Sequence, residues 1–168
     1  MQISNTPFEA LAVGDGIEVS RLVTARDVEL FAAVSGDHNP LHLDPEYAKK
    51  TQFGECIGHG MLIGAFLSAI IGLEFPGPGT VYLGQTLEFR SPIFLGDTLT
   101  FNLSVSEKHA KRSWITMAVT VNNQDGKLVA RGESKVIAPT ESETVTIVPP
   151  PSVELVDHDS PKVSGDVN

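Results

Sequence analysis

The segment "VSGDHNPLHLD", residues 34–44, places two aspartates and two histidines within eleven residues. Asp37 and His42 lie five positions apart in it, on either side of Asn39-Pro40. If this segment folds back on itself, the carboxylate and the imidazole of that pair converge on one point. A carboxylate accepts a proton, and an imidazole, whose reference pKa is about 6.5, exchanges one near neutral pH. Together the two groups could hold a water molecule and move its protons, as general acid–base catalysis requires.

The same residues are also typical of an ordinary turn, because Asx side chains readily bond their own backbone. Pro40 disfavours helical backbone in the residue before it, so we expect a non-helical segment here. In either case Asn39 is expected to fix the loop by hydrogen bonds to the backbone rather than to react. His38 is expected to point elsewhere, and Asp44, which precedes a proline, to cap the next helix.

The sequence "GHGML", residues 58–62, indicates a second kind of chemistry. If a helix begins here, its first N–H groups lack partners within the helix and carry the positive end of its dipole. Gly60 would let a substrate approach the backbone closely, so that negative charge on a carbonyl oxygen is stabilised as in an oxyanion hole. Alternatively, Gly58 and Gly60 only permit tight packing, and His59 is interpreted as a structural histidine. Ser68 follows Gly60 by about two turns, and its hydroxyl is equally consistent with a bond to its own helix.

Three segments have helical patterns that would position these residues. Residues 24–36 have Thr24 as an N-cap, helically spaced apolar side chains and Gly36 as a stop. Residues 46–53 are consistent with a further helical turn. Residues 56–75 are apolar on every face, and a helix with no polar face is expected to be buried on all sides.

The sequence outside these helical segments predicts strands. Residues 80–137 are rich in β-branched and aromatic side chains, with turn signals at "LGD" (95–97) and "NQDG" (123–126). We expect strands near 80–90, 98–107, 113–122 and 127–137, and a fifth at "IEVSRLV", residues 17–23. The predicted fold class is α+β, with a curved, mostly antiparallel sheet wrapped around one long central helix.

Composition limits the function classes. The 168 residues fit one domain with a tail, and a net charge of −9 argues against nucleic acid and anionic lipid as partners. Residues 139–168 hold three consecutive prolines, six acidic residues and one lysine, which is typical of a poorly packed extension with short extended pieces at 144–148 and 152–156.

We expect no membrane span and no secretory signal. Cys56 is the only cysteine, which excludes an intramolecular disulfide and fits a cytoplasmic protein. No set of histidines and carboxylates has convincing metal-ligand spacing, so no metal is expected.

Taken together, "FAAVSGDHNPLHLDPEYA", "HGMLIGAFLSAIIG", "PGPGTVYLGQTLEFRSPIFLGDTLT" and "GKLVARGES" occur in an order that resembles one known family. The sequence is similar to (R)-specific enoyl-CoA hydratases of the MaoC-like dehydratase family, of the PhaJ type, over roughly residues 7–138. The resemblance implies a hot-dog fold in residues 1–138, followed by the extension at 139–168. It also implies a homodimer with active sites near the subunit boundary, and reversible syn-addition of water to trans-2-enoyl-CoA to give (R)-3-hydroxyacyl-CoA.

The resemblance also assigns roles to residues that match the family motif. Asp37 and His42 match the catalytic pair that holds water, and Gly60 matches the glycine whose N–H polarises the thioester carbonyl. Ser68 matches a serine near the pair, and Asn39 is expected to keep the loop in shape. No redox cofactor or metal is implied, since hydration changes no oxidation state. The candidates for binding the CoA phosphates are Lys49, Lys50, Arg90, Lys111 and Arg112.

Two other function classes share parts of this pattern. A hot-dog acyl-CoA thioesterase would use the same fold and ligand, but no Asp-x-Asn-Pro-x-His loop is expected in it. A non-catalytic subunit that binds acyl thioesters would be expected to have lost the pair, whereas Asp37 and His42 are both present. The acyl-chain length and the metabolic pathway cannot be predicted from the sequence, although Gly64, Ala65 and Ala69 leave room for a medium-length chain.

Overall fold

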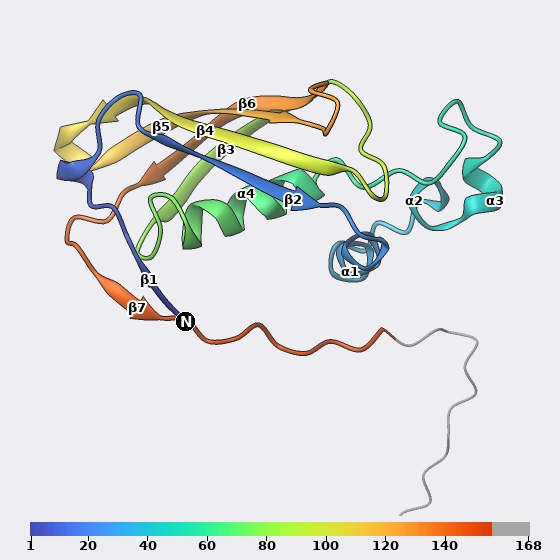
Figure 1. The fold of residues 1–168 in the computed structure, drawn as a ribbon, viewed down its shortest axis with the longest axis horizontal. Helices are drawn as coiled ribbons and strands as arrows, with labels where there is room; N and C mark the ends of the chain where they lie inside the picture. Colours follow the sequence, from blue (N-terminus) through green and yellow to red (C-terminus); the bar gives the residue numbers. More distant parts are fainter. Residues whose placement is uncertain (156–168) are drawn as a thin grey trace, which may run out of the picture.

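A computed structural model describes residues 1–155 of the chain (Figure 1). A five-stranded antiparallel sheet in the order β2-β4-β5-β6-β3 lies over one longer helix, and three shorter helices gather at one end. The helices are α1 (Ala25–Ser35), α2 (Pro40–Leu43), α3 (Pro45–Ala48) and α4 (Leu62–Leu73), with 3-10 turns η1 (Phe8–Ala10) and η2 (Ala110–Arg112). The strands are β1 (Gln2–Ser4), β2 (Gly16–Leu22), β3 (Val81–Phe89), β4 (Thr98–His109), β5 (Trp114–Asn122), β6 (Leu128–Ile137) and β7 (Thr144–Thr146).

The five predicted strands and the predicted α+β, hot-dog architecture are confirmed. In β4 every second residue from Leu99 to Val105 is buried, while the residues between them are less buried or exposed. This alternation is expected when one face of an antiparallel sheet packs on the core and the other faces solvent. The hairpin that joins β5 and β6 turns at Gly126, which has a φ of 74°.

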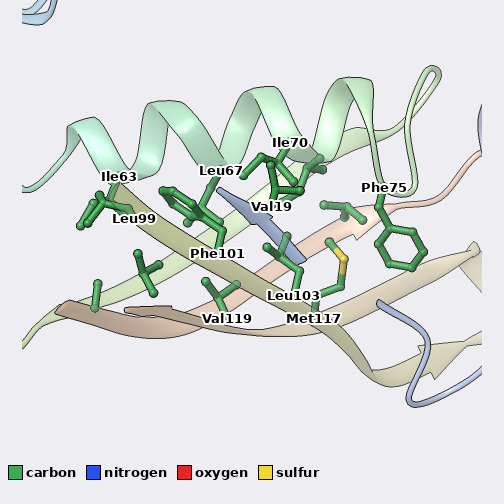
Figure 2. Close-up of a cluster of buried hydrophobic side chains, with 14 of the residues drawn as sticks. Val19, Ile63, Leu67, Ile70, Phe75, Leu99, Phe101, Leu103, Met117 and Val119 are labelled. Carbon is green, nitrogen blue, oxygen red and sulfur yellow. The ribbon is translucent and has the colours of Figure 1, made fainter. Parts of the chain in front are cut away.

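Helix α4 provides the other half of the core (Figure 2). Ile63, Leu67 and Ile70 are almost fully buried and face Leu99 and Phe101 of β4. Their spacing of three and four residues places them on one side of the helix, which is the pattern expected of an amphipathic packing face. The helix therefore fixes the position of its own N-terminal end relative to the sheet.

Two expectations about this helix are wrong. It does not include the whole apolar stretch 56–75 but begins at Leu62, the end of the 58–62 segment considered as its start. The residues before it are extended: Ile57 pairs with Phe94, and Gly58 donates its N–H to the carbonyl of Ile93. Because glycine is a poor helix former, the pairing with Ile93 and Phe94 decides the local structure of this segment. The helix is also not buried on all sides of the single chain, since its other face is exposed and consists of Met61 at the cap, Ala65, Ser68, Ala69 and Leu73.

The shorter helices carry the loop with the two aspartates and two histidines. Thr24 and Asp27 form a capping box at the start of α1, and Gly36 ends it in the left-handed conformation, as predicted. The expectation of a non-helical segment is wrong at Pro40, which begins the short helix α2. Proline restricts the residue before it, here Asn39, but its own fixed φ suits the first helical position.

The chain between residues 140 and 155 is mostly exposed, as predicted for a poorly packed extension, and the expected extended piece at 144–148 contains β7. Strand β7 pairs with β1, and Asn5, which is 9% exposed, joins them by accepting from the N–H of Glu143 and donating to the carbonyl of Glu141. Residues 148–155 then continue as an extended segment without regular structure, and the carbonyl of Val153 accepts a hydrogen bond from Arg26 of α1. The predicted division at residue 138 stays a prediction. The end of the second expected extended piece, 152–156, lies outside the described residues.

Among residues 1–155, no helix has the length and apolar character needed to cross a membrane.

Candidate active site

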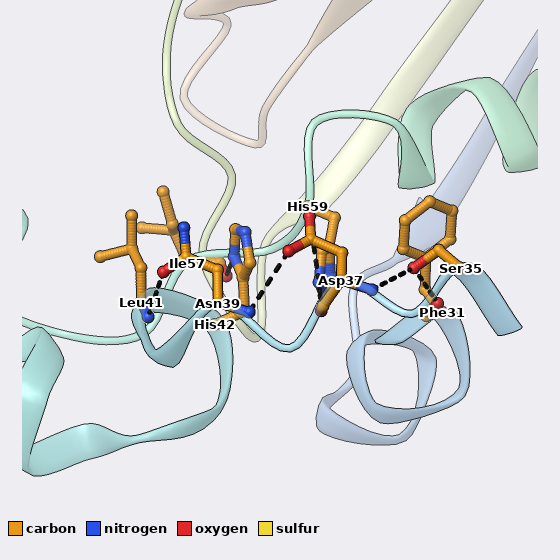
Figure 3. Close-up of polar contacts among 8 residues, drawn as sticks. All are labelled: Phe31, Ser35, Asp37, Asn39, Leu41, His42, Ile57 and His59. Atoms are coloured by element: carbon orange, nitrogen blue, oxygen red, sulfur yellow. Dashed lines mark hydrogen bonds and ion pairs between the residues drawn. The ribbon is translucent and has the colours of Figure 1, made fainter. Parts of the chain in front are cut away.

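Asp37 lies in a short loop between α1 and α2 whose shape is set by local hydrogen bonds (Figure 3). The N–H of Asp37 donates to Ser35 Oγ at 3.2 Å, and the N–H of Asn39 donates to Asp37 Oδ1 at 3.3 Å. Asn39 Oδ1 in turn accepts from the N–H of Leu41 at 3.1 Å and so caps α2. The side chain of Asp37 is 51% exposed, which leaves its carboxylate accessible to a ligand.

His42 projects from α2 toward the segment that precedes α4. Its Nδ1 lies 2.7 Å from the carbonyl oxygen of Ile57. Because a carbonyl oxygen can only accept, Nδ1 carries a hydrogen in this arrangement. The remaining ring nitrogen, Nε2, is therefore the atom through which His42 can exchange a proton with a ligand.

One carboxylate oxygen of Asp37 and one ring nitrogen each of His42 and His59 lie within 4.8 Å of one another. A water molecule bridges two polar atoms at about this separation, because it makes two hydrogen bonds of about 2.8 Å at a tetrahedral angle. The structure thus brings together the carboxylate and the imidazole that the sequence analysis paired. Asp37 belongs to the loop between α1 and α2, whereas His42 belongs to α2 and is oriented by its hydrogen bond to the carbonyl of Ile57.

Gly60 lies two residues before α4, beside this pair. Among the described residues no backbone carbonyl accepts its N–H, so the group can donate to a ligand. Gly60 and His42 line the same pocket, which has a volume of about 380 Å³. A Cβ at Gly60 would meet the ring of Phe89 at 3.2 Å, so the absence of a side chain keeps this approach open.

That pocket extends from Gly60 toward the loop after β3 and also includes Phe53 and Arg90. Among the five predicted phosphate-binding side chains, Arg90 is therefore next to the site, where it also lies 3.8 Å from Glu88. Lys49 pairs with Glu46, and Lys50 is exposed on the neighbouring turn after α3. Lys111 and Arg112 lie in η2, at the end of β4 opposite the short helices.

Ser68 lines an open groove between α4 and β3 rather than the pocket that His42 and Gly60 line. Phe31, Met61, Gly64, Ala65, Ser68, Tyr82 and Gln85 line this groove, which has a volume of about 380 Å³. Within residues 1–155 Ser68 makes no side-chain hydrogen bond, so the alternative of a bond to its own helix is not observed. Of the three small residues expected to leave room, Gly64 and Ala65 line the groove, whereas Ala69 does not.

Tyr82 forms the polar side of this groove. Its hydroxyl donates to Gln85 Oε1 at 2.5 Å, and Ser134 donates to the same oxygen at 2.6 Å. Burial raises the pKa of the Tyr82 phenol, and its hydrogen bond with Ser134 lowers it by a smaller amount. The phenol is therefore held in its neutral form.

His59 is the residue at this site that the sequence analysis treated as structural. Its side chain is 2% exposed, and its ring stacks on that of His42 with centroids 3.8 Å apart. The cluster with Asp37 and His42 is poorly suited to a metal ion. One nitrogen of each ring already contacts a backbone carbonyl, that of Ile57 for His42 and that of Asp37 for His59, and the other nitrogen of His59 is buried.

Comparison with known proteins identifies the family. The family of MaoC-like domains matches residues 12–127. This chain belongs to the MaoC-like domain family. The (R)-specific enoyl-CoA hydratase of Aeromonas caviae is 39% identical to this MaoC-like protein over 131 residues, which are 78% of this chain and 98% of the relative. The 3-hydroxybutyryl-CoA dehydratase of Methylorubrum extorquens is 38% identical over 136 residues, 81% of this chain and 86% of the relative.

A solved structure extends this similarity. The R-hydratase PhaJ1 from Pseudomonas aeruginosa, in its unliganded form, has a TM-score of 0.89 and 47% identity to this MaoC-like protein. The match covers 93% of this chain and 100% of that structure. Because residues 1–138 amount to a smaller share of the chain, the match includes part of the C-terminal extension.

Proposed function

We propose that this protein is an (R)-specific enoyl-CoA hydratase, which catalyses reversible syn-hydration of trans-2-enoyl-CoA to (R)-3-hydroxyacyl-CoA. The observation that carries the proposal is the placement of Asp37 and His42 beside the unpartnered N–H of Gly60. The activities of the (R)-specific enoyl-CoA hydratases and the hydroxybutyryl-CoA dehydratase to which the chain is similar support it.

In this proposal the pair handles the reacting water. The water donates a hydrogen bond to the Asp37 carboxylate and also contacts Nε2 of His42, so that its oxygen faces the β-carbon of the enoyl group. Asp37 takes a proton as the C–O bond forms, and Nε2 of protonated His42 gives a proton to the α-carbon. The proton on Asp37 then returns to His42, since side-chain atoms of the two residues lie within 4.8 Å of each other. Both new bonds form on the same face, as syn-addition requires.

Gly60 has a separate role in this proposal. Attack at the β-carbon moves electron density onto the thioester oxygen, which becomes enolate-like. The Gly60 N–H would donate to that oxygen, and a preorganised donor of this kind stabilises charge that develops in the transition state. No electrons are exchanged with a cofactor in this reaction, because hydration leaves the overall oxidation state unchanged.

We propose that two copies of the chain form a homodimer by joining their β3 edges. Strand β3 lies at one edge of the sheet, and Val81, Leu83 and Phe89 on it are 53%, 43% and 47% exposed. The exposed face of α4 lies next to it and presents Ala65, Ala69 and Leu73. Antiparallel pairing of two identical edges is self-complementary about a twofold axis, and it would cover the open groove that contains Ser68. A cytoplasmic location is also proposed, in keeping with the free thiol of Cys56.

One assay separates this proposal from its alternatives. The protein is mixed with crotonyl-CoA and, in a second reaction, with a longer trans-2-enoyl-CoA, and loss of the conjugated enoyl absorbance is followed together with release of free thiol. Hydration without thiol release, giving product that is (R) by chiral chromatography, is the expected result. A thioesterase would release thiol, a non-catalytic subunit would change neither signal, and either outcome would refute the proposal.

A further inference from the structure

His59 is a buried imidazole with one hydrogen-bond partner. Its Nε2 lies 3.0 Å from the backbone carbonyl oxygen of Asp37, and Nδ1 is buried and has no partner among the described residues. Because the carbonyl can only accept, Nε2 carries the hydrogen. A second hydrogen on Nδ1 would be buried without an acceptor, which is unfavourable, so the arrangement fits the neutral tautomer that is protonated at Nε2.

The ring of His59 also lies between aromatic side chains from two helices (Figure 3). On one side it stacks on His42 of α2, at 3.8 Å between centroids and 32° between planes. On the other side it contacts Phe31 of α1, at 4.9 Å and 46°. The orientation of the His42 ring is thus limited by His59 at its face and by the bond from Nδ1 to Ile57 at its edge.

The loop around Asp37 depends on the same side chain. Residues 36–40 are all exposed, and the other backbone hydrogen bonds of Asp37 and His38 remain within the loop, to Ser35 and Gly36. Among the described residues, the hydrogen bond from His59 is what connects the Asp37 backbone to the buried segment before α4. This segment also contains Gly60, so His59 lies where it can fix the pair relative to the proposed carbonyl-binding N–H.

We propose that His59 is a positioning residue for the hydration reaction, acting through the Asp37 backbone and the His42 ring rather than on the substrate. This inference rests on the proposed function. A displacement of about 1 Å at a reacting group can lower a rate by about a hundredfold. Loss of His59 is therefore expected to lower kcat, while the substrate pocket and KM remain largely as they are.

Three variants separate the contacts of this side chain. His59→Gln has a side-chain N–H at the same reach and can still donate to the Asp37 carbonyl, whereas His59→Phe retains the stacking and loses the donor. His59→Ala loses both. With crotonyl-CoA, His59→Ala is expected to lower kcat between about tenfold and a hundredfold with KM changed less than about threefold. His59→Gln is expected to retain the largest share of kcat among the three.

His38→Gln is the matched control, because His38 is an exposed histidine of the same loop whose side chain makes no hydrogen bond within residues 1–155. It is expected to keep wild-type kcat. Thermal unfolding of each variant shows whether the fold is retained. A His59→Phe variant with wild-type kcat would overturn the inference, since the tie to Asp37 would then be dispensable, and so would an effect confined to KM.

A measurement without turnover tests the same geometry. In ¹⁵N spectra of the imidazole groups at pH 7.5, His59 is expected as the Nε2–H tautomer and His42 is expected to carry a hydrogen at Nδ1. An Nδ1–H tautomer for His59 would contradict the tie to Asp37 even if every variant were inactive. Wild-type protein that hydrates neither crotonyl-CoA nor a longer trans-2-enoyl-CoA would refute the proposed function. The Nε2–H tautomer of His59 in that protein would show that the hydrogen bond to Asp37 exists without the proposed chemistry.

Discussion

The backbone carbonyl of Ile57 accepts a hydrogen bond from Nδ1 of His42 at 2.7 Å. The bond joins the short helix α2 to the extended segment before α4, and it decides which ring nitrogen of His42 faces the site. Together with the bond from His59 to the carbonyl of Asp37, it means that both members of the acid–base pair are held by one buried segment. The geometry of the proposed active site is therefore set by residues 57–60 as much as by the loop that contains the pair.

Replacing Asp37 by asparagine tests the proposed base. The amide has nearly the same shape but cannot take a proton from water, so kcat for crotonyl-CoA hydration is expected to fall at least about a hundredfold. Asp125→Asn makes the same chemical change in the exposed β5–β6 turn and should retain full activity. Normal turnover by Asp37→Asn would refute the assigned role.

His42→Asn separates the two nitrogens of this ring. The asparagine amide lies near the position of Nδ1 and can still donate to the Ile57 carbonyl, but nothing replaces Nε2. We expect kcat to fall at least about a hundredfold, with a change in the free energy of unfolding of only about 1 kcal/mol. Kinetics and urea unfolding measured on the same preparation check both parts. A large loss of stability would mean that the variant reports on folding, and His42→Gln would then be compared.

The ends of the helices around the loop were predictable from the sequence because capping chemistry is local, whereas the catalytic interpretation of Asp37 and His42 depended on the family resemblance. Thr24 and Gly36 mark the ends of α1 by their capping chemistry, and Asp44 caps α3 by accepting from the N–H groups of Glu46 and Tyr47. The long strands were likewise predictable from their β-branched and aromatic residues and from the turn signals between them. These features depend on residues a few positions apart, so the sequence contains the information directly.

Features that depend on distant partners were not predictable in this way. Hydrophobicity does not distinguish an extended buried segment from a buried helix, and the pairing of Ile57 with Phe94 and of Gly58 with Ile93 makes this segment extended. The positions of His59 and of the β1–β7 pair depend on contacts across the fold. For His59, a histidine within an otherwise apolar stretch was the available signal, but nothing in the sequence identified the Asp37 carbonyl as its partner.

Gly60→Ala tests the proposed carbonyl-binding N–H. The new methyl group would approach the ring of Phe89 at 3.2 Å and crowd the pocket lined by Gly60 and His42. The N–H remains, so we expect less than the full loss that follows removal of an oxyanion donor, about tenfold or more in kcat/KM. The double variant Gly60→Ala/Phe89→Ala relieves the crowding against the ring. Full recovery in the double variant would indicate that the single variant acted only through Phe89.

Leu83→Lys tests the proposed dimer. Leu83 is 43% exposed on the edge strand β3, and a charge buried between two copies would be unfavourable. Loss of a central apolar contact costs about 2 kcal/mol, so we expect dimerisation to weaken by at least about thirtyfold. Light scattering coupled to size-exclusion chromatography measures the mass. Val13→Lys, at a side chain 63% exposed outside the sheet, is the control, and an equal effect of both variants would contradict the assignment of β3 as the interface.

Tyr82→Phe tests the half-buried phenol beside the groove. Burial raises the pKa of Tyr82 above its ordinary value of 10.0, so the folded state retains the phenolic proton at a pH where the unfolded chain has begun to lose it. The folded state therefore binds more protons than the unfolded state above about pH 10, and stability falls as pH rises through the folded value. Phenylalanine removes the titrating group, so the decline in the free energy of unfolding between pH 8 and about pH 10.5 should be smaller in the variant.

Urea unfolding at one protein concentration measures this difference, since a dimer's stability depends on concentration. At pH 8 the variant is expected to lose about 1 kcal/mol, because the hydroxyl no longer donates to Gln85 Oε1, although Ser134 still does. Tyr47→Phe makes the same chemical change at the other tyrosine, which is 48% exposed, and is the matched control. A Tyr82→Phe variant that loses stability as steeply as the wild type would show that some other group causes the alkaline decline.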